Sequence, residues 1–302
     1  MIGKVFFVIA VLIASVGIYV RYIVLQEEFF DTDRLKGKRI LITGGSSGIG
    51  EALAYTCAKY GAQVVITARR ETLLQEVVSK CDKISGRKLH SYIVADMENV
   101  TRSSAVVDNA KDRLGGLDYV ILNHAFIHDL FPWTGSDEDF DLLQRVYQIN
   151  FLSHVKMAAR SMTSLKQSHG RLIVISSLGG KLPSPFMTPY IMSKFALDGF
   201  FGSLNQQLMI EKSNISLTVC NLGLVDTKRA HDVFESFPGT KAGIADADYG
   251  DVYDVAYEIL KAGTLGKKRL IYPNEWTLKM LLIVDLFFPD LIDASDRELF
   301  GN

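Results

Sequence analysis

Residues 39–50 read RILITGGSSGIG, and this stretch decides the fold. An apolar run that is typical of a buried strand leads into a glycine-rich turn, and a helical pattern follows from Glu51 to Tyr60. Gly44, Gly48 and Gly50 let the backbone turn tightly and approach a pyrophosphate, and the next helix offers free N–H groups and the positive end of its dipole. This order predicts a dinucleotide site. No G-K-[ST] follows the loop, so a P-loop is not indicated.

The second strand, residues 63–68, ends at two arginines, Arg69 and Arg70. A site that prefers NAD(H) would carry an acid here for the ribose diol, whereas arginine pairs well with a 2′-phosphate. The pair therefore favours NADP(H) over NAD(H). The alternative is that both arginines are solvated at the start of the next helix.

Strand and helix patterns alternate over most of the remaining chain. Helices are expected at 72–84, 101–114, 190–211 and 249–263, with two more run together over 137–166, and strands at 89–94, 119–122, 171–176, 216–220 and 269–272. This alternation predicts an α/β fold of Rossmann type, a doubly wound parallel sheet in a single domain. Right-handed crossovers bring the loops after the strands to one edge of the sheet. Asp96, which could take the adenine amino group, and Asn123 should therefore lie near the glycine loop.

A serine, a tyrosine and a lysine form a second candidate motif. Ser177 lies just past an apolar strand, and Tyr190 and Lys194 stand four residues apart, on one face of a helix. Reduction of a carbonyl by hydride transfer needs a proton for the oxygen. A free tyrosine titrates near pH ~10, and a neighbouring ammonium lowers that pKa. Without the surrounding sheet, the pattern Tyr-x-x-x-Lys would more simply indicate a packed tyrosine and a surface lysine that have no catalytic role.

From Leu35 to Tyr272 the chain resembles the short-chain dehydrogenases/reductases, and within them the 11-beta-hydroxysteroid dehydrogenase type 1 group. The resemblance is carried by Thr-Gly-x-x-x-Gly-Ile-Gly, Asn-x-Ala and Ser…Tyr-x-x-x-Lys in one order, and by residues 165–168, 176–181, 193–201 and 222–227. It implies a homodimer, a catalytic domain in the lumen of the endoplasmic reticulum, and a lipophilic ketone or alcohol as substrate.

The resemblance also implies a role for each matching residue. Tyr190 would be the general acid/base, Lys194 would lower its pKa and hold the nicotinamide ribose, Ser177 would bind the substrate oxygen, and Asn150 would support the proton relay. The residues implied for NADP(H) are Gly44, Ser46, Ser47, Gly48, Ile49, Gly50, Arg69, Arg70, Asp96, Met97, Asn123, His124, Ala125, Tyr190, Lys194, Val225, Asp226 and Thr227. Those implied for the substrate are Ser177, Met187, Leu222, Gly223 and Leu224.

Two departures from the family pattern bear on function. The family often reads Asn-Asn-Ala-Gly where this chain has Asn-His-Ala-Phe, and we expect His124 to pack or hydrogen-bond because proton transfer is already assigned. Ser184 stands where steroid-active relatives tend to carry an aromatic contact, which keeps retinoid or fatty-acyl carbonyls open as substrates. A non-catalytic NADP(H)-binding sensor or scaffold is the alternative of another class, and the intact triplet argues against it.

The N-terminus is expected to be a membrane anchor. A spanning helix needs about 20 apolar residues, which residues 2–25 supply if Lys4 and Arg21 snorkel to the interfaces. A cleaved signal peptide is the rival interpretation and would make the protein secreted. The expected organisation is an anchor at 1–25, a linker at 26–35, a catalytic domain at 36–272 and an apolar C-terminal helix and tail at 273–302. Asn99 and Asn214 lie in sequons and permit glycosylation of a lumenal domain.

The remaining features narrow the possible partners. A net charge of −1 gives no basic field for nucleic acid, and three widely spaced cysteines indicate neither a zinc site nor a disulfide framework.

Residues 276–288 are apolar but too short to span a bilayer; we expect them to pack on the domain or on a dimer partner, with the membrane surface as the alternative. Residues 228–248 show weak periodicity and are a natural place for a substrate lid.

Overall fold

The computed structural model describes residues 30–235, 249–273, 275–288 and 290–291. The expected anchor at residues 1–25 lies outside this range, as do residues 26–29 of the expected linker. Of the helices in the described part, none is long and apolar enough to cross a membrane. The described residues from Thr32 onward belong to one compact unit.

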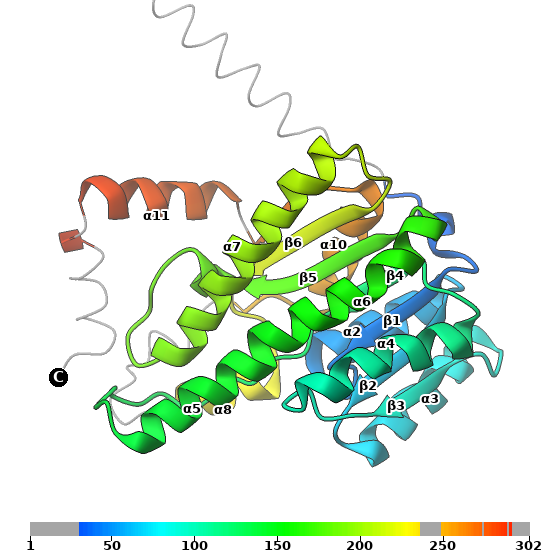
Figure 1. The fold of residues 1–302 in the computed structure, drawn as a ribbon, viewed down its shortest axis with the longest axis horizontal. Helices are drawn as coiled ribbons and strands as arrows, with labels where there is room; N and C mark the ends of the chain where they lie inside the picture. The colour runs from blue at the N-terminus through cyan, green and yellow to red at the C-terminus, as the bar shows by residue number, and fades with distance from the viewer. Residues whose placement is uncertain (1–29, 236–248, 274, 289, 292–302) are drawn as a thin grey trace, which may run out of the picture. The chain divides into compact units, whose positions relative to one another are not determined.

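Seven parallel strands form a single sheet in the order β3-β2-β1-β4-β5-β6-β7 (Figure 1). The strands are β1 (Arg39–Thr43), β2 (Gln63–Ala68), β3 (Ser91–Val94), β4 (Tyr119–Leu122), β5 (Arg171–Ser177), β6 (Ser216–Leu222) and β7 (Arg269–Tyr272). The strand order reverses between β1 and β4, and ligands of such sheets bind in the crevice beyond the carboxyl ends at this switch point. The predicted Rossmann-type sheet is confirmed.

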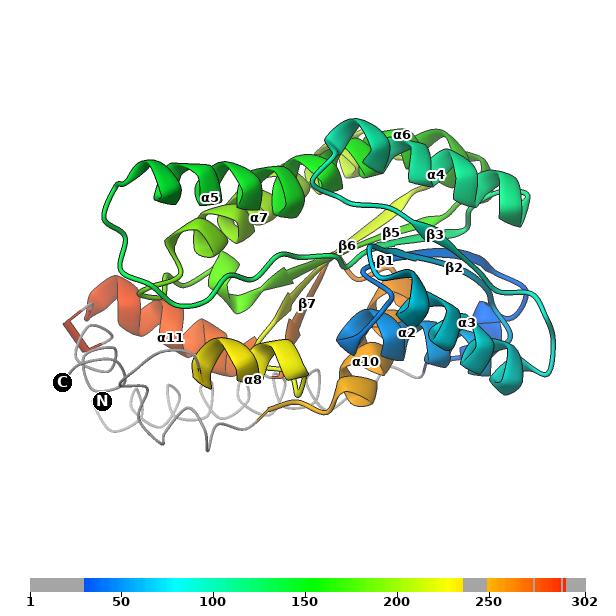
Figure 2. The same ribbon diagram turned by 90° about the horizontal axis from the view of Figure 1, so that it is seen from below.

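Helices cover both faces of the sheet. They are α2 (Gly48–Lys59), α3 (Glu71–Ser85), α4 (Val100–Leu114), α5 (Asp137–Tyr147), α6 (Ser153–Ser168), α7 (Thr188–Ile210), α8 (Lys228–Glu235), α10 (Val252–Leu265) and α11 (Glu275–Phe287), with short turns η1 (Thr32–Leu35), η2 (Gln148–Leu152) and η3 (Leu178–Gly180). Figure 2 shows α4, α5, α6 and α7 on one face and α2, α3 and α10 on the other. Sheets covered in this way bury both faces of their strands, and every residue of β4 is buried.

Two elements differ from the sequence-based expectation. The double helical pattern over 137–166 is joined by one turn of π-helix, η2, which carries Asn150 into the interior, fully buried. A π turn adds one residue to the helical repeat, so a 3.6-residue pattern does not reveal it. Residues 228–235 of the expected lid form the regular helix α8, whereas residues 236–248 lie outside the described part.

The glycine loop has the backbone that its sequence predicts. Gly44 and Gly48 have φ angles of +68° and +57°, a conformation that side chains disfavour. A Cβ on Gly44 would lie 2.8 Å from the Cα of His124, and one on Gly50 would collide with the carbonyl oxygen of Gly44. These close approaches let the loop fold back over the start of α2 and leave its outer side open to a ligand.

Candidate active site

A cavity of ≈ 330 Å³ opens beyond the carboxyl ends of β1, β2, β3 and β4. Most residues predicted to hold NADP(H) line it: Gly44, Ser46, Ser47, Gly48, Ile49, Arg69, Arg70, Asp96, Met97, Asn123, His124, Ala125 and Thr227. The glycine loop and the N-terminus of α2 form one wall, which suits a pyrophosphate. The structure therefore brings together, in one cleft, residues from four separate strand ends.

The two arginines after β2 contribute positive charge to this cavity, which Lys228 and Arg229 also line. The guanidinium of Arg70 donates to the hydroxyls of Ser46 at 3.1 Å and Ser47 at 2.8 Å, so it lies against the glycine loop. Arg69 is exposed and lines the same cavity. An extra phosphate on the adenine-side ribose would meet both cations here, so the residues present fit NADP(H).

A second cavity, of ≈ 370 Å³, adjoins the first and contains the Ser-Tyr-Lys triplet. Of the predicted residues it is lined by Ser177, Met187, Tyr190, Lys194, Leu222, Gly223, Leu224 and Val225. The two cavities share Ile49, Asn123, Ala125, Ile127 and Thr227. A dinucleotide in the first cavity would thus extend its far end toward the triplet in the second.

Lys194 is the most enclosed member of the triplet, with 2% of its surface exposed. Its ammonium donates to the carbonyl oxygen of Ile175 at 3.2 Å and lies 5.5 Å from the centre of the Tyr190 ring. Burial lowers the pKa of Lys194 to about 8, and the nearby carboxylate of Asp198 acts in the opposite direction. The side chain therefore still carries its charge near neutral pH.

Tyr190 differs from the expectation in its acidity. The sequence suggests that the ammonium of Lys194 lowers the pKa of this phenol, but burial raises that pKa above its ordinary value, and the hydroxyl of Ser177 is what opposes the increase. A buried phenol resists becoming an anion because the charged form loses its hydration. In this state Tyr190 holds its proton, which is the form needed to protonate an oxygen.

Ser177 ends β5 and turns its hydroxyl toward the second cavity. The hydroxyl oxygen accepts a hydrogen bond from the main-chain N–H of Gly179 at 3.0 Å. A Cβ on Gly179 would lie 2.7 Å from the terminal methyl of Ile191, which would have to shift. The bond to Gly179 uses a lone pair of the Ser177 oxygen and not its hydrogen, and the same hydroxyl interacts with the phenol of Tyr190.

Asn150, which the resemblance gives as a support of the proton relay, lines neither cavity. Its side-chain oxygen accepts from the N–H of Phe126 at 2.7 Å, and its amide donates to the Phe126 carbonyl at 2.9 Å and to the Ser193 hydroxyl at 3.2 Å. The side chain of Asn150 thus bonds to both the main-chain N–H and the main-chain carbonyl of Phe126. Asn150 therefore fixes the position of the loop that follows β4. Asn150 stabilises this loop from a position outside the two cavities.

His124 lies in a buried chain of hydrogen bonds. The hydroxyl oxygen of Thr43 accepts from the N–H groups of Asn123 and His124; it donates to the carbonyl of Ile121 at 3.4 Å and lies 2.7 Å from the Nδ1 atom of His124. The neutral ring then donates from Nε2 to Ser153 at 2.6 Å, and Ser153 donates to the carbonyl of Ile149 at 2.6 Å. Burial lowers the pKa of His124 to about 3, so the ring stays neutral and ties β1 to η2.

Two residues predicted to hold the cofactor line neither cavity. Gly50 lies under the glycine loop, where only a hydrogen fits. Asp226 accepts from the Nε2 atom of His231 at 2.8 Å, and its N–H donates to Gly250. Both therefore act on the shape of the loops that surround the cleft.

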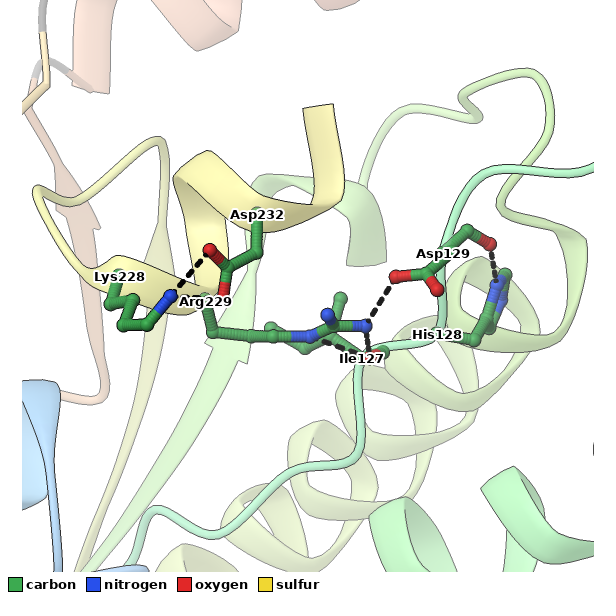
Figure 3. A network of polar contacts seen from close by, with 6 residues as sticks. All are labelled: Ile127, His128, Asp129, Lys228, Arg229 and Asp232. Atoms are coloured by element: carbon green, nitrogen blue, oxygen red, sulfur yellow. Dashed lines mark hydrogen bonds and ion pairs between the residues drawn. The ribbon is translucent and has the colours of Figure 1, made fainter. Parts of the chain in front are cut away.

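The sequence did not indicate how α8 is joined to the chain after β4. Arg229, in the first turn of α8, donates to the carbonyl of Ile127 from both Nε and Nη2, and Nη2 also meets Asp129 at 2.9 Å (Figure 3). Arg229 and Ile127 both line the nucleotide cavity. Beyond them Val233 and Phe234 of α8 close one side of the second cavity. This wall was missed because α8 is short and the contact of Arg229 with Ile127 joins segments that lie far apart along the chain.

The chain belongs to the short-chain dehydrogenases, since the model of that family matches residues 38–237. Among similar proteins, the hydroxysteroid 11-beta-dehydrogenase 1-like protein of Danio rerio is 40% identical over 264 residues, covering 87% of this chain and 88% of the relative. The protein of the same name from Gallus gallus is 40% identical over 269 residues, with 89% of each chain covered. The oxidoreductase character of the family agrees with the triplet described above.

Solved structures share the fold. A short-chain dehydrogenase of Burkholderia cenocepacia in complex with NADP has a TM-score of 0.67 at 26% identity, covering 79% of this chain and 97% of its own. A short-chain dehydrogenase of Escherichia coli complexed with NADPH has a TM-score of 0.69 at 23% identity, covering 81% of this chain and all of its own. At that identity the similarity shows only a shared fold.

Proposed function

We propose that this protein is an NADP(H)-dependent oxidoreductase that interconverts a lipophilic ketone and its secondary alcohol, with hydroxysteroids as the first class to test. The observation that carries the proposal is the meeting of Tyr190, Lys194 and Ser177 in a cavity that adjoins a nucleotide cleft lined by Arg69 and Arg70. The names of the hydroxysteroid dehydrogenase 1-like relatives support the substrate class.

Each of the three side chains has its own role in the reduction of the carbonyl. NADPH, when bound, supplies the hydride. Ser177 holds the carbonyl oxygen through its hydroxyl, and Tyr190 gives that oxygen its proton as negative charge develops there; a positioned acid contributes about 10²–10⁴ in rate. Lys194 keeps a positive charge beside the phenol and favours the phenolate that remains.

The second cavity supports an apolar substrate. Leu178, Met187 and Phe234 contribute to its lining, together with Leu222, Leu224 and Val233. Ser184 lines it as well and adds a hydroxyl at a position where an aromatic side chain would favour a flat steroid ring. Retinoid or fatty-acyl carbonyls are therefore the second candidates.

The membrane location is a further part of the proposal. An N-terminal anchor would hold the catalytic domain in the lumen of the endoplasmic reticulum, as a homodimer. The two sequons support this: Asn99 and Asn214 are exposed, and Asn99 caps α4 through its side-chain oxygen, which leaves its nitrogen for a glycan. Glycosidase treatment should shift the mobility of the wild type and leave Asn99→Gln plus Asn214→Gln unchanged; protease access from the cytosolic side of sealed microsomes would contradict the lumenal location.

The enzymatic proposal is tested with purified protein, NADPH and a panel of ketosteroids, retinals and fatty aldehydes. We expect loss of nicotinamide absorbance with at least one carbonyl and no loss in Tyr190→Phe. Equal rates in the two proteins would refute the catalytic assignment. Tight NADPH binding without turnover of any carbonyl would favour a sensor or scaffold that binds NADP(H).

A further inference from the structure

Asp198 is a buried carboxylate close to the catalytic triplet. It lies on α7 one turn after Lys194, and its side chain is 5% exposed. A charge at this depth is costly unless other groups compensate it. The partners of Asp198 are therefore informative, and all of them belong to the surroundings of the catalytic triplet.

One oxygen of Asp198 joins two segments. Oδ2 accepts from the ammonium of Lys181 at 2.8 Å and from the side-chain amide of Asn221 at 2.7 Å. The same amide of Asn221, on β6, donates to the main-chain carbonyl of Ser177 at 3.1 Å. The segment that begins at Ser177 and ends at Lys181 is thus tethered to one carboxylate at both of its ends.

The space around this carboxylate is also restricted. A Cβ on Gly180 would lie 3.0 Å from Oδ2 of Asp198 and 2.9 Å from the carbonyl oxygen of Lys194. The turn η3, which follows Ser177, can therefore pack directly against α7. Charge-assisted bonds of this kind are shorter and stronger than neutral ones, so they hold position as well as contribute energy.

Asp198 also lies one helical turn from Lys194 on α7, and its carboxylate favours the charged form of that lysine. The titratable groups around the Lys194 ammonium are Tyr190 and Asp198 on α7, Lys181 after η3, His124 after β4 and His154 on α6. His124 and His154 have pKa values lowered by burial and stay neutral. Asp198 is the carboxylate of this group, and its ion pair is with Lys181 at 2.8 Å.

From these contacts we infer that Asp198 is a positioning residue for the catalytic triplet: it fixes the turn that carries Ser177, through Asn221 and Lys181, and it is the counter-ion that keeps Lys194 charged. The expected effect of Asp198 on turnover rests on the proposed function. The expected effect of Asp198 on the charge of Lys194 does not depend on turnover.

Three variants separate the two roles. Asp198→Asn keeps the shape and removes the charge, Asn221→Leu removes the tether to Ser177, and Lys181→Met removes the competing cation. The turnover number should fall by between about 10- and 100-fold in Asp198→Asn and Asn221→Leu, because misplacement of a reacting group by ~1 Å can cost up to ~10² in rate. Asp108→Asn breaks an exposed ion pair with Arg160 on the helical surface and serves as the matched control, with no change expected.

The pKa of Lys194 gives the second readout. It is followed by NMR in protein labelled with ¹³C at the lysine side chains, without cofactor, and the signal is assigned with Lys194→Met. The pKa should fall by about one unit in Asp198→Asn, rise in Lys181→Met and stay unchanged in Asn221→Leu. A merely structural carboxylate would not move this pKa in opposite directions in two variants.

The outcomes distinguish this inference from the proposed function. Opposite shifts in Asp198→Asn and Lys181→Met support the counter-ion role even if no carbonyl is turned over. Shifts of the same sign, or none, in folded variants would overturn it. If Asp198→Asn does not fold, Lys181→Met decides, since Lys181 is partly exposed and its loss leaves the tether through Asn221 in place: an unchanged pKa of Lys194 there would contradict the inference.

Discussion

The ammonium of Lys194 donates to the main-chain carbonyl of Ile175 at 3.2 Å, two residues before Ser177 on the same strand. This bond joins the catalytic helix α7 to the strand that carries the catalytic serine. Because Lys194 is enclosed, its charge acts on Tyr190 through protein and with little screening by water. The position of this ammonium thus links the strand that carries Ser177 to the helix that carries Tyr190.

The rate of carbonyl reduction should fall as the pH rises through about 8. The pKa of Lys194 is lowered to about 8, so the ammonium is lost above that value, whereas burial keeps the phenol of Tyr190 protonated to higher pH. The measurement is the turnover number for a ketone with saturating NADPH between pH 6 and pH 10. In Lys194→Arg the falling limb should move to higher pH, because a guanidinium keeps its proton. A limb at the same pH in this variant would show that Lys194 is not the titrating group.

Arg69→Asp should weaken NADPH far more than NADH. A charge-assisted pair with a phosphate contributes about 1.5–3 kcal/mol, so the dissociation constant for NADPH should rise by about 10- to 100-fold. Calorimetric titration with both cofactors measures the two effects. Arg87→Asp changes the same charge at an exposed position that does not line the cavity, and it is the matched control. Equal losses for NADPH and NADH would contradict a role of Arg69 in phosphate binding.

Arg229→Ala should release NADPH faster. Arg229 holds α8 to the loop after β4 at the cavity wall, so the variant loses the bonds to Ile127 and the ion pair with Asp129. We expect the dissociation rate to rise about tenfold, equivalent to about 1.4 kcal/mol. Stopped-flow fluorescence of bound NADPH, chased with NADP⁺, gives the rate directly.

Two further variants separate the contributions of Arg229 to the NADPH dissociation rate. Asp129→Asn removes only the exposed ion pair and should change the rate less, because such pairs contribute about 0.2–1 kcal/mol. Arg160→Ala breaks a surface ion pair outside both cavities and should have no effect. The same rate in Arg229→Ala and wild type would mean that α8 is held by its apolar packing alone.

His154→Phe should reduce the loss of stability in acid. The ring of His154 is buried and stacks on His124 with 4.0 Å between centres, and burial lowers the pKa of both rings below their ordinary value. The unfolded chain therefore binds more protons below pH ~6.5, and the free energy of unfolding falls as the pH falls. Each such histidine contributes up to ~1.4 kcal/mol per pH unit. Urea unfolding at pH 7 and pH 5 should show a smaller difference in the variant, and an identical difference would exclude His154 as a source.

The sequence predicted the sheet well because its strands are short, apolar and separated by clear helical patterns. The bounds of β1, β2, β4 and β7 are those expected, and the glycine loop and the Ser-Tyr-Lys triplet lie at one edge as predicted. Local signals were sufficient here, since each motif is read from adjacent residues. The topology then followed from the handedness of the crossovers.

The features that the sequence did not predict depend on contacts between distant segments. Asn150 is directed inward by a π turn and bonded to Phe126, and the pKa of Tyr190 is raised by burial that only the assembled site creates. The links from Asp198 through Asn221 to Ser177, and from Arg229 to Ile127, join residues far apart along the chain. No periodicity or spacing marks such pairs.

The most direct test of the central claim is the transfer of deuteride from NADPH labelled at C4 of the nicotinamide to a ketone, counted by mass spectrometry of the alcohol. The wild type should form singly deuterated alcohol. Tyr190→Phe, which keeps the ring and removes the proton, should bind NADPH normally and form alcohol at least about 10²-fold more slowly. Deuterated alcohol formed at equal rates by the two proteins would contradict the account.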